Sequence, residues 1–406
     1  MRILEINAYD FGSTGKIMLG IANIAREHGY EVFTCSSTIK GSRTSSNNHF
    51  YIDKPSSTKI HKFFGLLFGE EFRFSNKGTN NLINFIKRVK PDIIHIHNIH
   101  GYFLNIGQLF DFFKTLDCKF VWTLHDCWSF TGRCPHFGLT NCERWKTGCY
   151  DCVYNRKLYP ESFFADRTKR NWKKKKDIFC GLNHLTLVTP SNWLAGLAGQ
   201  SFLQQYPIKV INNGIDLSIF KPVQSNFRKD HGISKDKFIL LGVAFNFNRR
   251  KGIDVFIELS KRLNEKYQVV LVGTNEEIDA ILPKNIISIH RTESQRQLVE
   301  IYSASSLFVN PTREDTFPTV NMEALACGIP VVTFNTGGSP EVIDGSCGSV
   351  VERDDIASLE KEIIRICENK PYSKSACLKR AKVFDATTKF RDYLALYEEL
   401  GNNHNF

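Results

Sequence analysis

Short apolar runs alternate with helical segments along the chain, and this alternation restricts the possible folds more than any other feature of the sequence. A strand, a helix and a second strand in succession build a parallel sheet covered by helices. In the first half we expect a helix over residues 15–28, closed by Gly29. The strands expected there are 2–8, 31–36, 92–98, 119–125 and 185–190. The polar stretch 41–57 is expected to be a loop, because it is rich in Ser, Thr and Asn.

A second series of the same kind begins near residue 238. Its expected strands are 238–243, 269–273, 286–290, 307–310 and 331–333, and its helices include 254–263, 295–303 and 356–367. A chain of 406 residues is too long for one ordinary core. The fold class predicted is therefore α/β, with two doubly wound, Rossmann-like parallel sheets.

Three acidic residues follow the apolar run 307–310. Glu314 and Asp315 fall in the loop after it, and Glu323 falls inside the next helical segment, 321–326. Open parallel sheets bind ligands at the carboxyl ends of their strands, beside helix N-termini. Carboxylates accept hydrogen bonds from sugar hydroxyls, and free N–H groups meet phosphate charge. The pattern favours a ligand with hydroxyls and phosphates; the alternative is that these acids only complement a helix dipole.

Two further loops follow predicted strands and suit an anion. Residues 248–252 read Asn-Arg-Arg-Lys-Gly, and Arg250 with Lys251 would hold a diphosphate. Cations at the start of a helix oppose its dipole, so a bound anion explains them better than helix stability does. The loop 12–16 holds Gly12 and Gly15, which allow backbone to approach a phosphate. Its spacing does not fit a Walker A motif.

His125 leaves the apolar strand 120–124 at its carboxyl end, where a side chain reaches a ligand site. The alternative is a core histidine with satisfied hydrogen bonds. His95, His97 and His100 alternate on and after another strand, and we interpret them as core or rim residues.

Cysteines are concentrated in one segment: five of the twelve lie between positions 127 and 152. In a reducing compartment, clustered cysteines indicate a metal before a disulfide. We therefore expect a structural Zn²⁺ bound by Cys134, Cys142, Cys149 and Cys152. The alternative is an ordinary loop of reduced thiols.

The chain carries a net charge of +11, which favours anionic partners. Its densest basic segment, 167–176, fits either a solvated helix face or docking on an anionic membrane surface. No nucleic-acid reader module is present, so we expect no nucleic-acid partner. No apolar run approaches the ~18 residues of a membrane span, and the N-terminus lacks the apolar core of a signal peptide. These features predict a cytoplasmic protein.

Several of these motifs together resemble the family 4 retaining glycosyltransferases. The acidic block resembles the family's nucleotide-sugar signature of two glutamates: Glu323 matches the second, and Asp315 stands where the first is expected, with Glu314 one residue earlier. The Gly12–Gly15 loop, Lys251 and His125 fall at positions matching the glycine loop, the diphosphate-binding lysine and the sugar-contacting histidine. The loop Gly337-Gly-Ser339-Pro-Glu341 resembles the family's donor-pocket loop, and 209–216 resembles its hinge.

The resemblance implies the GT-B architecture, with two domains facing a cleft. Residues 1–205 would form the acceptor-side domain, residues 206–382 the nucleotide-sugar domain, and 383–406 a helix returning to the first domain, with a disordered tail from 401. It implies a nucleotide-diphosphate sugar as co-substrate and no catalytic metal. By this resemblance, Lys251 and Arg250 would bind the diphosphate, with Gly12 and Gly15 nearby. Glu323 would bind the ribose, and either Asp315 or Glu314 would contact the sugar. His125 would orient the sugar, and Ser339 would line the donor pocket.

Within the family, the closest resemblance is to bacterial glycosyltransferases of capsule, exopolysaccharide or O-antigen assembly. It implies a glycan or lipid-linked saccharide acceptor at the inner face of the membrane. Two alternatives stay open: a nucleotide-sugar epimerase on the same fold, and a basic zinc-containing protein that binds nucleic acid.

Overall fold

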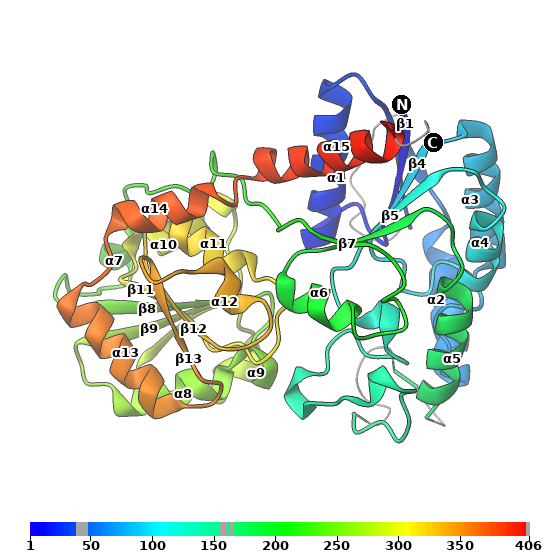
Figure 1. Cartoon of the computed structure of the whole chain (residues 1–406). Coiled ribbons are helices and arrows are strands. Elements are labelled where there is room, and N and C mark those ends of the chain that lie inside the picture. Colours follow the sequence, from blue (N-terminus) through cyan, green and yellow to red (C-terminus); the bar gives the residue numbers. More distant parts are fainter. Residues whose placement is uncertain (38–47, 155–160, 163–165, 403–406) are drawn as a thin grey trace. The chain divides into compact units, whose positions relative to one another are not determined.

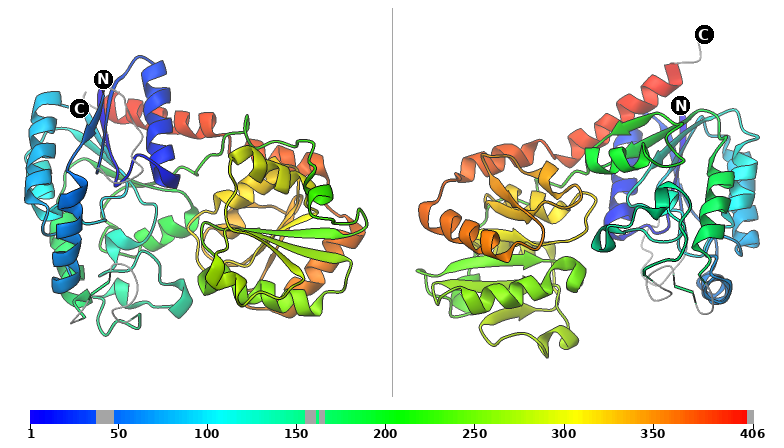
Figure 2. Two further views of the ribbon diagram at one scale, coloured as in Figure 1. Left: turned by 180° about the vertical axis from the view of Figure 1, so that it is seen from behind. Right: turned by 60° about the horizontal axis from the view of Figure 1, so that its bottom comes forward.

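A computed structural model describes residues 1–37, 48–154, 161–162 and 166–402 of the chain. The chain forms two compact units (Figures 1 and 2). Unit 1 consists of Met1–Asn212 together with Thr387–Phe406, and unit 2 consists of Asn213–Ala386. The chain therefore leaves the first unit, builds the second and returns to the first.

Unit 1 contains a seven-stranded sheet in the order β3-β2-β1-β4-β5-β6-β7, in which every neighbouring pair is parallel. The strands are β1 (Arg2–Ile6), β2 (Glu31–Ser36), β3 (His49–Tyr51), β4 (Ile93–Ile96), β5 (Lys119–Thr123), β6 (Leu185–Thr189) and β7 (Ile208–Val210). Since the strands are parallel, their carboxyl ends share one edge of the sheet, and the loops after β1, β4 and β5 meet there.

Helices cover both faces of this sheet. The α-helices are α1 (Gly12–Glu27), α2 (Pro55–Phe68), α3 (Asn76–Val89), α4 (Ile106–Phe113), α5 (Thr168–Phe179), α6 (Asn192–Ala198) and α15 (Ala386–Asn402). Alternate residues of β1 face opposite sides: Ile3 packs with α1 and α15, whereas Leu4 and Ile6 pack with α3 and α4. Burial on both faces explains why the interior strands are nearly continuous apolar runs. Figure 1 shows α15 crossing beside α1.

Unit 2 contains a six-stranded parallel sheet in the order β10-β9-β8-β11-β12-β13. The strands are β8 (Phe238–Val243), β9 (Tyr267–Val272), β10 (Ile286–Ile289), β11 (Leu307–Asn310), β12 (Val331–Phe334) and β13 (Gly348–Val351). The helices are α7 (Phe227–Asp230), α8 (Ile253–Arg262), α9 (Glu276–Asp279), α10 (Gln295–Ala304), α11 (Thr319–Ala326), α12 (Ser339–Val342), α13 (Ile356–Asn369) and α14 (Lys374–Lys382). Helices α8 and α13 pack on one face, and α10, α11 and α14 on the other.

The segment between β5 and α5 has little regular structure. Its described part forms three single-turn 3₁₀ helices, η1 (Trp128–Phe130), η2 (Gly138–Thr140) and η3 (Arg144–Lys146). Aromatic packing holds these turns together, because the rings of Phe130 and Phe137 lie 5.2 and 5.3 Å from that of Trp145.

Three strands were not expected from the sequence: β3, β7 and β13. All three lie at sheet edges, where a strand pairs on one side only and buries fewer side chains. The expected loop 41–57 is therefore wrong at its end, since β3 and the start of α2 fall within it, while 41–47 lies outside the described residues. In the expected disordered tail, residues 401 and 402 belong to α15, and 403–406 also lies outside the described part.

Across the described ranges, no helix combines the length and the apolar character that crossing a bilayer requires.

Candidate active site

In unit 2, the loops that follow β8 and β11 are joined to each other. Residues Arg249–Lys251 form the single turn η5, and the Asn248 side chain caps it by accepting from the Lys251 N–H at 3.1 Å. Gly252 ends the turn with φ +75°, and a Cβ there would lie 2.5 Å from the Pro311 carbonyl oxygen. The residue must be glycine, because both this backbone conformation and the close approach exclude a side chain.

An ion pair connects the predicted basic and acidic residues. Lys251 Nζ lies 2.6 Å from Asp315 Oδ2, with both side chains about one-fifth exposed. Arg250 Nη1 donates to the Glu314 carbonyl oxygen at 3.4 Å. Glu314 itself is buried, at 6% exposure, whereas the Asp315 carboxylate shares the partly exposed surface with the Lys251 ammonium. Asp315, Lys251 and Arg250 therefore belong to one local arrangement.

Arg313 holds this acidic loop in place. Its guanidinium donates two hydrogen bonds to the Asp254 carboxylate, at 2.8 and 2.9 Å, and a third to Asp354 at 2.6 Å. The side chain is only 8% exposed. The two parallel bonds of the bidentate pair with Asp254 give the guanidinium a defined orientation. Sequence reasoning gave Arg313 no role, since its partners lie 59 and 41 residues away in the chain.

Glu323 projects from α11 and is oriented by a tyrosine of α10. The Tyr302 hydroxyl donates to Glu323 Oε2 at 3.0 Å. Tyr302 is fully buried. Burial, reinforced by the negative charge of Glu323, raises the pKa of Tyr302 well above its ordinary value. The phenol therefore stays protonated and acts as a permanent donor to the carboxylate, a role that the sequence did not reveal.

The glycine loop after β12 packs directly on the acidic loop. Gly337 has φ +56°, a Cβ on it would lie 1.8 Å from the Asp315 carbonyl oxygen, and the Gly338 N–H donates to that oxygen at 3.1 Å. Ser339 begins α12 and is fully buried. Among the described residues its hydroxyl oxygen has no hydrogen-bond partner, which is uncommon for a buried polar group. Unit 2 thus gathers Arg250, Lys251, Asp315 and Ser339 on adjoining loops at the carboxyl edge of its sheet.

In unit 1, the predicted glycines lie at the start of α1. Gly12 has φ +73°, and a Cβ on Gly15 would lie 2.7 Å from the Asp10 carbonyl carbon. Both observations explain why this turn requires glycine, and they place the first N–H groups of a 16-residue helix at the carboxyl edge of the sheet.

His125 lies at the same edge and is connected to a buried polar network. Its Nε2 lies 3.0 Å from His97 Nδ1, and the two rings stack at 5.3 Å. Burial lowers the pKa of His125 to about 4, against the opposing charge of Asp126. The imidazole is therefore neutral at physiological pH and offers one donor and one acceptor.

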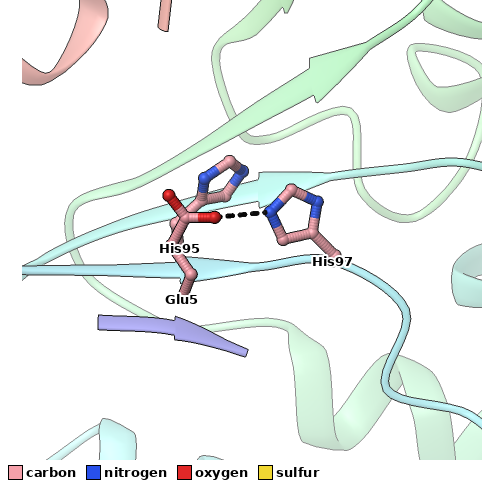
Figure 3. Close-up of side chains that lie close together, drawn as sticks. All are labelled: Glu5, His95 and His97. Atoms are coloured by element: carbon pink, nitrogen blue, oxygen red, sulfur yellow. Dashed lines mark hydrogen bonds and ion pairs between the residues drawn. The ribbon is translucent and has the colours of Figure 1, made fainter. Parts of the chain in front are cut away.

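The network continues from His97 to Glu5, whose Oε2 lies 3.3 Å from His97 Nε2 (Figure 3). His95 lies between Tyr397 Oη at 2.6 Å and Thr123 Oγ1 at 2.8 Å. Glu5, His95 and His97 hold three potential metal-ligand atoms within 4.8 Å of one another. All four nitrogens of these two imidazoles have hydrogen-bond partners, whereas among the described residues Glu5 Oε1 is buried without one.

His100 and Asp126 form a separate pair at the rim, 3.1 Å apart. Burial lowers the pKa of His100, but the charge of Asp126 and its hydrogen bond outweigh burial and raise the pKa above its ordinary value. Burial likewise opposes ionisation of Asp126, yet His100 brings its pKa down to about 2. The pair lies beside His125 in a small pocket at the ends of β4 and β5.

The four cysteines expected to bind zinc line a single pocket in the loop before α5. The Gly132 N–H donates to Cys149 Sγ at 3.1 Å, and Cys149 and Asp151 both have positive φ. Burial raises the pKa of the Cys149 thiol to about 12, so it is neutral without a cation beside it. The sulfurs stand further apart than in a closed metal site, since among the described residues only Glu5, His95 and His97 bring three ligand atoms within 4.8 Å. The residue types fit zinc, and these four cysteines would hold it as thiolates.

Comparison with known proteins gives matches over most of the chain. Residues 16–219 match the family model described as Glycosyltransferase Family 4, and residues 223–383 match the model described as Glycosyl transferases group 1. WcaC of Escherichia coli K12, whose name assigns it as a glycosyl transferase of colanic acid biosynthesis, is 27% identical over 306 residues. That match covers 71% of this chain and 72% of WcaC.

Solved structures share the fold of this chain. The sucrose-phosphate synthase of Thermosynechococcus elongatus superposes with a TM-score of 0.73 at 17% identity. The superposition covers 99% of this chain and 100% of the synthase chain. HepE of Anabaena, solved with UDP-glucose, gives a TM-score of 0.66 at 14% identity, covering 98% and 100%. The two Rossmann-like parallel sheets and the GT-B fold expected from the sequence are confirmed.

Proposed function

This chain belongs to the family 4 glycosyltransferases, and from that premise we propose that it moves a sugar from a nucleotide-diphosphate donor to an acceptor hydroxyl with retention of anomeric configuration. The observation that carries the proposal is the Lys251–Asp315 ion pair, which joins the basic loop after β8 to the acidic loop after β11. The pair sets a cation for phosphate beside a carboxylate for hydroxyl groups, as a nucleotide sugar requires.

The largest negative charge in the proposed reaction develops on the departing diphosphate. Lys251 and Arg250 hold its charge, and positioned cations of this kind lower the barrier without forming a covalent bond. In the free protein Asp315 neutralises Lys251. When the donor binds, its diphosphate takes over Lys251, and the released Asp315 carboxylate accepts hydrogen bonds from the sugar. Glu314 contributes mainly through its backbone carbonyl, which already holds Arg250.

Glu323 accepts hydrogen bonds from the two ribose hydroxyls. Tyr302 supports this role, because its hydroxyl occupies one carboxylate oxygen and fixes the rotamer. Ser339 offers its unpartnered hydroxyl to the donor.

The proposal also assigns roles to residues of unit 1. Gly12 and Gly15 present backbone N–H groups of α1 to the anionic donor, as helix starts favour negative charge. His125, neutral at working pH, orients the transferred sugar by hydrogen bonds. No catalytic metal has a role in this scheme.

The acceptor proposed is a lipid-linked saccharide of surface polysaccharide assembly, modified by a cytoplasmic enzyme at the inner face of the membrane. WcaC supports it, since its printed name places that relative in colanic acid biosynthesis. The exposed basic side chains of α5, among them Lys169, Lys173 and Lys176, support peripheral contact with the anionic headgroups around such an acceptor.

A thermal-shift screen against UDP-, GDP- and dTDP-sugars tests the donor site. One donor class is expected to raise the melting temperature, because ligand binding stabilises the folded state by mass action. Glu323→Gln and Lys251→Ala are each expected to remove that shift and to lower kcat/KM by roughly a hundredfold or more. Asp315→Asn is expected to lower kcat far more than Glu314→Gln, and NMR of the anomeric proton in the product reports retention.

Matched controls are available in the same unit. Glu300→Gln on α10 and Lys261→Ala on α8 change the same residue types on the helix surface and are expected to leave both readouts unchanged. Absence of any shift with all nucleotides would contradict the donor site. Conversion of the donor to its epimer without an acceptor would favour the epimerase alternative instead.

A further inference from the structure

Helix α2 (Pro55–Phe68) presents large apolar side chains to solvent. Ile60, Phe63, Phe64 and Phe68 are 57%, 56%, 39% and 46% exposed. Their spacing of three, four and eight residues places them on one face of the helix. The rings of Phe64 and Phe68 also pack against that of Phe74, with centroids 5.8 and 5.6 Å from it, so the face is an aromatic ridge. Contiguous exposed apolar surface of this kind marks an interaction site.

The exposed charged side chains of α2 itself are all basic. Lys59 and Lys62 are exposed on the same helix, which contains no acidic residue. At the C-terminal end of α2, the helix meets α5: Asn171 Nδ2 donates to the Gly69 carbonyl at 2.7 Å, and Lys174 Nζ pairs with Glu70 at 2.8 Å. Helix α5 adds further exposed basic side chains, namely Arg167, Lys169, Arg170, Lys173 and Lys176.

The position of α2 relates it to the acceptor end of unit 1. Gly65 packs against Tyr102, in the segment that follows β4, since a Cβ on Gly65 would lie 2.5 Å from the Tyr102 ring. Glu71, just beyond α2, accepts a hydrogen bond from Trp128 Nε1 in the segment after β5. Both partners lie at the carboxyl edge of the sheet, where His125 is found. The aromatic ridge therefore stands on the rim of the proposed site.

We propose that α2, with the basic surface of α5, is a membrane-docking element that inserts Ile60, Phe63 and Phe68 into the interface of an anionic bilayer. Apolar side chains flanked by lysines match an interface of acyl chains beneath anionic headgroups. An acidic protein partner would satisfy the lysines but would leave the protruding aromatic rings without a complementary pocket. The proposal deepens the proposed function, on which it rests, because a lipid-linked acceptor would then be presented at the rim of unit 1.

Cosedimentation of the full chain with vesicles tests the docking element without requiring turnover. The protein is expected to sediment with vesicles containing phosphatidylglycerol and to remain in solution with phosphatidylcholine alone. The double variant Ile60→Gln/Phe63→Gln is expected to weaken partitioning roughly tenfold or more, because two large apolar groups no longer insert. Lys59→Glu/Lys62→Glu is expected to weaken it to a similar extent and to reduce its dependence on salt.

The control variants lie in unit 2. Ile281 and Val350 are 58% and 44% exposed, so Ile281→Gln/Val350→Gln removes comparable apolar surface and is expected to leave partitioning unchanged. Lys235→Glu/Lys261→Glu is the matching charge control. Donor-induced thermal stabilisation, measured on every variant, separates this proposal from the proposed function: its retention alongside lost vesicle binding supports docking by α2.

Two results would overturn the proposal. The first is vesicle binding by the α2 variants equal to that of the wild type. The second is a dimer that forms without lipid in light scattering and that the variant Ile60→Gln/Phe63→Gln dissociates. Such a result would show that the ridge binds a second copy of the chain.

Discussion

At the scale of single residues, the candidate site depends on pairs whose members are distant in sequence. Lys251 and Asp315 are 64 positions apart, and Tyr302 and Glu323 are 21 apart. The motifs predicted which loops carry charged side chains, because strand-to-helix loops of parallel sheets are recognisable from the alternation of elements. They could not predict which acid pairs with Lys251, since that depends on the Gly337 backbone packing against the Asp315 loop.

The Glu5–His97–His125 series allows a prediction about the tautomer of His125. Burial raises the pKa of Glu5 well above its ordinary value, against the opposing charge of Arg26, so the carboxyl is expected to be protonated. A protonated Glu5 donates to His97 Nε2, His97 Nδ1–H then donates to His125 Nε2, and the remaining proton of His125 resides on Nδ1. Glu5 and His97 are thus positioning residues for His125.

Glu5→Gln is therefore expected to keep kcat/KM within about threefold, because an amide N–H can replace the carboxyl O–H as donor. Glu5→Leu is expected to lower kcat roughly tenfold or more with little change in KM, since the orientation of His125 is lost. Steady-state kinetics with the donor that the thermal-shift screen selects measures both. Equal losses in the two variants would show that an ionised Glu5, rather than a donor, is needed.

At the scale of elements, the predictions succeeded for buried strands and failed at the borders of the sheets. Interior strands such as β1 and β11 are buried on both faces and can be recognised in the sequence as apolar runs. The edge strands β3 and β7 contain only partly buried or exposed residues, and no such run marks them. The loop between β5 and α5 was recognised only by its cysteines, because its aromatic core has no periodicity.

That cysteine loop gives a prediction about metal content. Purified protein is expected to contain about one zinc per chain, since small loops without regular elements gain stability from a structural ion. Cys152→Ser is expected to lose the zinc and to lower the melting temperature. Cys180→Ser, which alters the residue that ends α5 outside the pocket, should keep it. Metal analysis showing less than ~0.2 zinc per chain in the wild type would contradict the assignment.

At the scale of the whole molecule, unit 1 is assembled from two separate parts of the chain. Residues Tyr393, Leu394, Leu396 and Tyr397 of α15 are buried in the same cluster as Ile3, Ile17 and Ile21. The Tyr397 hydroxyl lies 2.6 Å from His95 Nδ1, so the returning helix supplies a partner to the polar network behind His125. The expectation of a returning C-terminal helix came from the family resemblance; the apolar and tyrosine spacing alone would not have told which sheet it covers.

Tyr397→Phe is accordingly expected to destabilise unit 1 by about 1–3 kcal/mol, because it leaves a buried polar group without its partner. Glu399→Ala, on the same helix, removes only an exposed ion pair with Lys209 and is expected to cost less than about 1 kcal/mol. Hydrogen exchange followed by mass spectrometry measures both, with peptides of unit 2 as an internal reference. Unchanged protection of β1 and β4 in Tyr397→Phe would show that α15 contributes no more than its apolar side chains.

The return of α15 also reverses the usual order of events during protein synthesis. Domains generally fold from the N-terminus onward as the ribosome releases them. Here the strands of unit 1 emerge first, but the side chains that close one face of their sheet are translated only after the whole of unit 2, Asn213–Ala386. The nascent unit 1 therefore exposes Ile3, Ile17 and Ile21 while unit 2 is made, and the part of the enzyme that is begun first is completed last.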